Sequence, residues 1–278
     1  MRIVGGAVLA AAVLATGGCA SMARERIYRP AALAETPVTF RGEQPQAVSA
    51  TTQDGLTLQG YYSPPAPGNR TLVVYFHGNG WNQLVGAARA EPLRAGGHGV
   101  LVASYRGYGG NPGQPSETGL MRDAEGWMAR ARTLAPDARL YLFGHSLGGA
   151  VALEMAARHE VAGVATLGTF ARLSDQAPAL LRGFVPDRYD NEAAIARVEE
   201  PVLLIHGTAD AVVRYAAAER LRTVGGENVT VIRLPGAGHQ VDLALLADRL
   251  WHAWERGAGP AAERDWEAAP VAPPPVRP

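Results

Sequence analysis

Apolar residues recur along the chain in short runs that alternate with longer amphipathic stretches. The continuous apolar runs at 72–76 and 140–143 are typical of strands buried on both faces of a parallel sheet. The predicted strands are 48–52, 56–62, 72–76, 100–104, 140–143, 161–167, 202–206 and 229–234. The predicted helices are 83–94, 117–134 with Ser116 as the N-cap, 147–159, 215–224 and 241–254. This alternation predicts an α/β fold, with a mostly parallel central sheet and helices on both faces.

Both ends of the chain depart from this alternation. Residues 1–22 begin with a charged Arg2, continue with an apolar run over 3–15 and end in small residues, which predicts an export signal over 1–18. An uncleaved membrane helix is the alternative, because no residue between 3 and 23 is charged. Residues 257–278 hold six prolines without apolar periodicity and are predicted to be a disordered tail. These predictions leave one domain, 40–256, preceded by a linker over 19–39.

Cys19 is the only cysteine, which excludes an internal disulfide, a CxxC redox pair and a multi-cysteine zinc site. Its surroundings, Ala-Thr-Gly-Gly-Cys, resemble the bacterial lipoprotein box, in which the signal is cut before a cysteine that carries a diacylglycerol. The resemblance implies a lipid anchor on Cys19 and attachment to a membrane of the cell envelope, the outer membrane in a Gram-negative host. In the alternative, Cys19 belongs to an ordinary secretory signal and the protein is secreted or periplasmic.

Composition narrows the chemistry further. The 26 basic and 26 acidic residues balance, so the chain has no basic surface for nucleic acid. All 26 basic residues are arginine, which excludes Schiff-base chemistry and a phosphate-loop lysine. Because no HExxH motif is present either, we expect neither a metal nor a cofactor. The sequence carries no signal for a particular oligomeric state.

The segment 144–148 reads Gly-His-Ser-Leu-Gly, between a predicted strand and a predicted helix. In this context the GxSxG pattern predicts a sharp turn that exposes the hydroxyl of Ser146 as a nucleophile. A serine hydroxyl needs a base, and His239 in the loop after the last strand is the candidate. Asp210, after the strand 202–206, is the candidate acid that orients it. Taken singly, the alternatives are a solvated histidine and an Asx turn.

An acyl transition state also needs two backbone amides that hold its oxyanion. One is predicted to be the amide of Leu147, which follows the nucleophile in the chain. The other is predicted to come from the loop after the strand 72–76, where we assign Asn79, with Gly80 as the alternative.

Together, HGNG at 77–80, FGHSLGG at 143–149, PVLLIHGTAD at 201–210 and GAGH at 236–239 resemble the α/β-hydrolase superfamily of serine hydrolases. The branch that the chain resembles has a small lid and includes depalmitoylase-like, membrane-associated members. The resemblance implies hydrolysis of an ester or thioester of a small or lipid-like acyl substrate, through a Ser-His-Asp triad and an acyl-enzyme. An acyltransferase, a peptidase or a non-catalytic hydrolase-like binding protein are the alternatives. The lid is expected over 169–200, and its apolar residues either line an acyl pocket or pack in the ordinary way: Phe170, Leu173, Leu180, Leu181, Phe184 and Val185.

Overall fold

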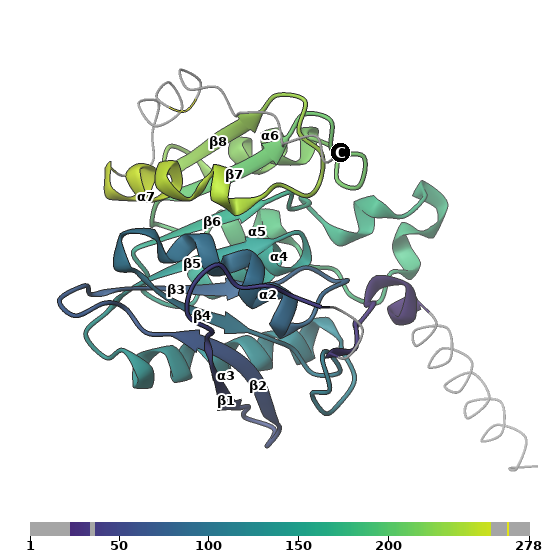
Figure 1. The fold of residues 1–278 in the computed structure, drawn as a ribbon. Helices are drawn as coiled ribbons and strands as arrows, with labels where there is room; N and C mark the ends of the chain where they lie inside the picture. Colours follow the sequence, from purple (N-terminus) through teal and green to yellow (C-terminus); the bar gives the residue numbers. More distant parts are fainter. Residues whose placement is uncertain (1–22, 34–36, 257–265, 267–278) are drawn as a thin grey trace, which may run out of the picture.

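The computed structural model describes residues 23–33, 37–256 and 266, and its centre is an eight-stranded sheet (Figure 1). The strands are β1 (Gln46–Thr51), β2 (Thr57–Ser63), β3 (Thr71–Phe76), β4 (Gly99–Ala103), β5 (Arg139–His145), β6 (Gly163–Leu167), β7 (Val202–Gly207) and β8 (Val229–Leu234). Their order is β1-β2-β4-β3-β5-β6-β7-β8. β1 and β2 pair antiparallel with their neighbours, and all other pairs are parallel. The predicted fold class is confirmed.

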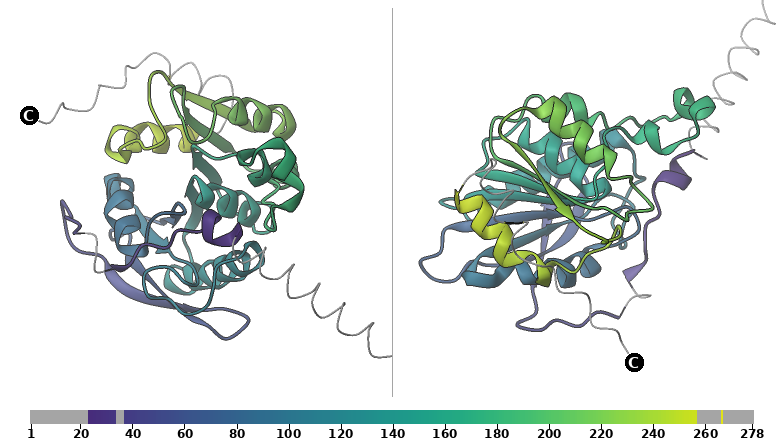
Figure 2. Two further views of the ribbon diagram at one scale, coloured as in Figure 1. Left: turned by 90° about the vertical axis from the view of Figure 1, so that its right-hand side faces the viewer. Right: turned by 90° about the horizontal axis from the view of Figure 1, so that it is seen from above.

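Helices cover both faces of the sheet (Figure 2). On one face lie α3 (Glu117–Leu134), α4 (Leu147–Ala156), α5 (Asn191–Ile195) and α6 (Ala216–Gly225). On the other face lie α2 (Gln83–Ala90), α7 (Ala247–Arg256) and the 3₁₀ turns η2 (Glu91–Gly97) and η5 (Leu243–Leu245). Each face has its own apolar cluster, because alternate side chains of the central strands point to opposite sides.

Local capping explains where the helices begin and end. Ser116 caps α3 as predicted, since its hydroxyl accepts a hydrogen bond from the amide of Gly119 at 3.1 Å. The helix predicted over 83–94 ends at Ala90 instead, where the backbone tightens into η2 around Pro92. The helix predicted from residue 241 starts only at Ala247, because Asp242 caps the separate turn η5 first.

The N-terminal segment differs from the linker that the sequence predicts. Tyr28 is only 2% exposed, and its hydroxyl lies 2.9 Å from Asp187 Oδ2 and 2.9 Å from the hydroxyl of Tyr189. The folded domain therefore begins before residue 40, since these polar contacts join the segment to residues about 160 positions away.

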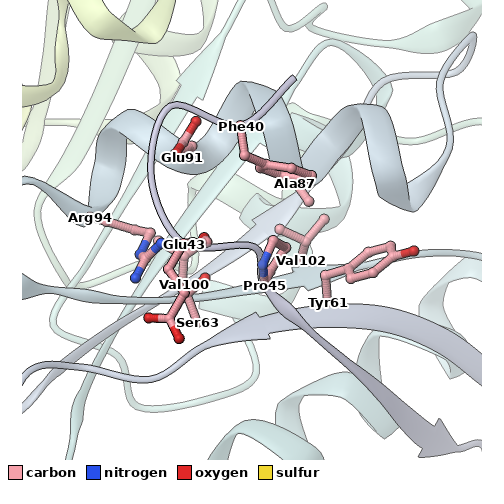
Figure 3. Close-up of a pocket in the computed structure, with 10 residues that line it drawn as sticks. All are labelled: Phe40, Glu43, Pro45, Tyr61, Ser63, Ala87, Glu91, Arg94, Val100 and Val102. Carbon is pink, nitrogen blue, oxygen red and sulfur yellow. Dashed lines mark hydrogen bonds between the residues drawn. The ribbon is translucent and has the colours of Figure 1, made fainter. Parts of the chain in front are cut away.

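A second contact holds the chain just before β1. The carboxylate of Glu91 accepts hydrogen bonds from the amides of Arg41 and Gly42, and Phe40 lies against Ala87 of α2 (Figure 3). The cavity below this stretch measures about 10 Å³, which is room for a single water and too small for a substrate.

The lid between β6 and β7 carries η3 (Leu173–Gln176), η4 (Ala179–Phe184) and α5. Its part with η3 and η4 projects from the sheet beside the first described turn of the chain, whereas α5 packs on the sheet face (Figures 1 and 2). No helix in the described ranges has the length and apolarity needed to cross a membrane. The predicted signal 1–18 and Cys19 lie outside the described residues. Within the tail, only Trp266 is described, and it departs from the predicted disorder because it is 5% exposed and packs in the apolar cluster of α7.

Candidate active site

Ser146 lies in the sharp turn between β5 and α4. Its backbone has φ 53° and ψ −116°, a conformation that costs free energy for a residue with a side chain. The flanking glycines make the turn possible, because a Cβ on Gly144 would overlap the carbonyl of Gly148, and a Cβ on Gly148 would overlap the carbonyl of Phe76. The amide of Ser146 donates to the carbonyl of Leu167 in β6 at 2.8 Å. The geometry is that of the turn predicted from GxSxG.

Asp210 and His239 form a hydrogen-bonded pair in the loops after β7 and β8. His239 Nδ1 donates to Asp210 Oδ2 at 2.7 Å, and the aspartate side chain is fully buried. The other carboxylate oxygen, Oδ1, accepts the amides of Val212 and Val213, each at 2.8 Å. Because the carboxylate fixes the proton on Nδ1, the Nε2 atom of His239 is left as the acceptor that a base requires.

The two loops and the serine turn meet at Gly168, directly after β6. A Cβ on Gly168 would lie 3.0 Å from His239 Nδ1 and 3.2 Å from Asp210 Oδ2. The ring of His239 lies 4.9 Å from the ring of His145, the neighbour of Ser146 in the chain. All three predicted triad residues thus lie at the carboxyl end of the sheet, where α/β proteins bind ligands. Within the described chain the Ser146 hydroxyl makes no hydrogen bond to His239, and such contacts are often long without a ligand.

Two further histidines support this pair, and the sequence analysis assigned them no role. His145 Nε2 donates to the carbonyl of His239 at 3.0 Å, and burial lowers the pKa of His145 to about 3. His206 Nε2 donates to the carbonyl of Val213 at 2.8 Å, and burial also lowers the pKa of His206. Both rings stay neutral near pH 7 and hold the backbone of the two loops. The only signal in the sequence is that each histidine ends a strand.

The two predicted oxyanion residues, Asn79 and Leu147, line the same cavity as Ser146. Leu147 is the first residue of α4, where backbone amides have no partner within the helix. Asn79 is held from outside the domain core: its side-chain nitrogen donates to the carbonyl of Ile27 at 2.8 Å, and its carbonyl accepts the amide of Arg29 at 3.2 Å. The N-terminal segment therefore positions the loop that carries Asn79.

The cavity beside Ser146 measures about 680 Å³, within the range of small-molecule sites. Five of the six lid residues predicted as candidate lining do line it: Phe170, Leu173, Leu181, Phe184 and Val185. Leu180 does not, and it is 92% exposed. Ala23, Arg26 and Ile27 form a further wall that the sequence analysis missed.

Two kinds of group, carboxylates in the cavity lining and clusters of metal ligands, are missing from the described residues. The described residues that line the cavity include no carboxylate side chain, and Arg26 is their one charged residue. Among the described residues of the chain, no cluster of three or more histidine, cysteine, aspartate or glutamate side chains is placed to hold a metal ion.

Comparison with known proteins agrees with this architecture. A family model described as "Serine aminopeptidase, S33" matches residues 67–189. The uncharacterized protein Rv2307c of Mycobacterium tuberculosis is 36% identical over 239 residues, which cover 83% of this chain and 84% of that relative. The uncharacterized protein YfhR of Escherichia coli is 31% identical over 207 residues, which cover 70% of this chain and 73% of YfhR. The chain belongs to the α/β serine hydrolase superfamily.

Solved structures show the same fold. The esterase Pf2001 of Pyrococcus furiosus superposes with a TM-score of 0.67 at 18% sequence identity, over 84% of this chain and 99% of that chain. At this level of identity the likeness concerns the fold, and the chemistry has to be argued from the site itself.

Proposed function

We propose that the protein hydrolyses carboxylic esters or thioesters through a triad of Ser146, His239 and Asp210. The observation that carries this proposal is the strained turn of Ser146, which borders a mostly apolar cavity. The hydrogen-bonded pair of Asp210 and His239 lies at the same end of the sheet. A non-catalytic binding protein would have no need for a serine in this costly backbone conformation.

In the proposed mechanism, His239 Nε2 takes the proton of the Ser146 hydroxyl as Oγ attacks the acyl carbonyl carbon. The oxyanion that forms accepts hydrogen bonds from the backbone amides of Leu147 and Asn79. The bond to the leaving alcohol or thiol then breaks, and His239 returns the proton to the departing oxygen or sulfur. His239 then deprotonates a water that attacks the acyl-enzyme; the bond from the acyl carbon to Ser146 Oγ breaks, His239 returns the proton to Oγ, and the acid leaves. Asp210 stabilises the imidazolium in both steps.

The lining of the cavity favours an acyl group over a peptide amino terminus. An aminopeptidase must bind a free ammonium group, and a buried ammonium needs an opposite charge. Arg26, the one charged residue among the described lining, would instead repel an ammonium. The apolar lining fits a hydrocarbon chain. An acyltransferase would use the same machinery with an acceptor other than water.

We further propose that Cys19 carries the lipid that attaches the enzyme to a membrane of the cell envelope. The sequence around Cys19 supports this assignment. Cys19→Ser is expected to move the protein from the membrane fraction to the soluble fraction. Unchanged membrane association of Cys19→Ser would instead favour an uncleaved membrane helix within the uncharged stretch between residues 3 and 23.

The catalytic proposal is tested with a fluorophosphonate probe, which labels an activated serine. The native chain is expected to be labelled and to hydrolyse p-nitrophenyl butyrate, and Ser146→Ala is expected to lose both properties. Ser174→Ala, in η3 of the lid, is the matched control and is expected to retain both. Labelling that survives in Ser146→Ala would exclude Ser146 as the nucleophile. Faster cleavage of an aminoacyl p-nitroanilide than of the ester would favour a peptidase.

A further inference from the structure

Large apolar side chains are concentrated on the surface around the cavity mouth. Leu180 is 92% exposed, Phe184 79%, Val212 61% and Leu181 54%. Three of these four also line the cavity, so the four residues form one patch, which we call the apolar rim. Exposed apolar side chains that gather in one place mark an interaction surface.

The described part of the chain begins at the same place. Ala23 and Ile27 line the cavity, and the Arg24 guanidinium donates to the buried carboxylate of Asp187 at 3.0 Å, at the end of the lid. Tyr28 donates to the same carboxylate at 2.9 Å. Figures 1 and 2 show this first turn beside the lid. The start of the described chain is therefore bound to the end of the lid, beside the cavity mouth.

The length of chain before Ala23 limits how far away a membrane attachment can be. Cys19 precedes Ala23 by four residues, which span at most about 14 Å when fully extended. The apolar run over 3–15 lies on the far side of Cys19. Whether a lipid on Cys19 or an uncleaved helix provides the attachment, the bilayer surface is brought close to the cavity mouth.

We propose that the apolar rim inserts into the lipid bilayer that holds the N-terminus, so that acyl chains pass from the bilayer directly into the cavity. The inference rests on the proposed membrane attachment and acyl chemistry. The occupant of the apolar rim is the lipid bilayer itself. The attachment at the N-terminus holds the domain at the bilayer, and an inserted apolar patch adds a second contact that turns the cavity mouth toward the lipid. Because the chain has no net charge, phosphatidylcholine without anionic lipid is expected to suffice.

Leu180 is the residue that separates membrane insertion from catalysis, because it belongs to the rim but does not line the cavity. The full chain is reconstituted in phosphatidylcholine vesicles that contain a long-chain fluorogenic ester, and a soluble short-chain ester is assayed in the same samples. Leu180→Gln is expected to slow hydrolysis of the embedded ester roughly three- to tenfold, since a buried leucine is lost from the lipid. The rate on the soluble ester is expected to stay unchanged.

Val224→Gln is the matched control, because Val224 is 41% exposed on α6 and does not line the cavity. It is expected to change neither rate. Equal rates of the native chain and Leu180→Gln on the embedded ester would overturn the proposal. The proposal would also be overturned if Leu180→Gln lost self-association while its rate on the embedded ester stayed unchanged. The apolar rim would then be a contact surface for a second copy of the chain.

Insertion of the apolar rim into the bilayer can also be measured directly, without any measurement of catalysis. In Leu180→Trp, brominated phosphatidylcholine is expected to quench the added tryptophan emission, relative to the native chain measured in parallel. Absence of added quenching would overturn the proposed insertion even if the soluble ester is hydrolysed. Quenching without hydrolysis of either ester would instead retain the membrane surface and reject the proposed enzymatic function.

Discussion

Replacement of Gly168 by alanine tests whether the Asp210–His239 pair depends on the space that this glycine leaves free. Gly168 has φ +63°, and a Cβ there would lie 3.0 Å from His239 Nδ1 and 3.2 Å from His239 Cε1. Non-bonded heavy atoms are most stable about 3.5–4.0 Å apart, so the imidazole has to move by about 0.5 Å or more. Such a shift along the bond stretches the 2.7 Å contact with Asp210 to about 3.2 Å, the upper end of the normal range.

The magnitude follows from the precision that catalysis requires. A displacement approaching 1 Å at a catalytic group costs up to about 10²-fold in rate. We therefore expect Gly168→Ala to lower kcat for p-nitrophenyl butyrate by roughly 10- to 100-fold, equivalent to about 1.4–2.7 kcal/mol in the activation free energy. Alanine at positive φ also destabilises the fold by roughly 1–2 kcal/mol, which urea unfolding measures.

Gly226 provides the matched control, since it has φ +84° and no atom within 4 Å of its hypothetical Cβ. Gly226→Ala is expected to lose at least as much stability without a change in kcat, because ψ −153° places Gly226 in a region that essentially only glycine occupies. The reasoning is refuted if Gly168→Ala loses stability as Gly226→Ala does but keeps its full kcat, because the contact with the imidazole would then have no effect.

Three other predictions follow from contacts and burial. Asp187→Ala removes the acceptor of Tyr28 and is expected to lower the free energy of unfolding by about 2–3 kcal/mol, measured by urea titration; an unchanged midpoint would mean that the N-terminal segment is not held there. Burial lowers the pKa of His77 to about 4 and that of His145 to about 3, from 6.5. The unfolded chain takes up both protons below about pH 6, whereas the folded protein stays neutral at His77 down to about pH 5 and at His145 down to about pH 4. Stability is therefore expected to fall by up to about 1.4 kcal/mol per pH unit for each histidine as the pH drops through these ranges, and a flat profile would contradict neutral rings. Trp266→Ala is expected to lower the free energy of unfolding by about 3 kcal/mol in the same urea titration, because buried apolar surface is lost. An unchanged free energy of unfolding would mean that Trp266 does not pack against α7.

Much of the fold could be predicted from the sequence because its signals are local. Largely apolar runs of four to seven residues predicted β3 to β8, since a strand buried on both faces has to be apolar throughout. The turn residues Gln53-Asp54-Gly55 predicted the hairpin of β1 and β2. The bounds at 229–234 were exact, whereas the helix expected from 241 begins only at Ala247. Helix ends are less predictable, because side-chain caps and prolines decide them residue by residue.

The candidate site divides in the same way. Ser146, Asp210 and His239 were chosen because each follows a predicted strand, and parallel strands bring their carboxyl ends to one edge of the sheet. Position after a strand identifies candidate residues, but it does not give the distance between any two side chains. The 2.7 Å contact of Asp210 with His239 depends on how two loops pack around Gly168.

The sequence by itself determined the alternation of strands and helices, the serine turn and the order of the candidate triad, because these depend on neighbouring residues. Only the tertiary structure decided that Ala23, Arg26 and Ile27 form one wall of the cavity, that Leu180 faces solvent, and that Trp266 is buried. The physical reason is that each of these features depends on contacts between segments far apart in the sequence. The hydrogen bond of Tyr28 with Asp187 joins residues 159 positions apart, and no local pattern encodes such a contact.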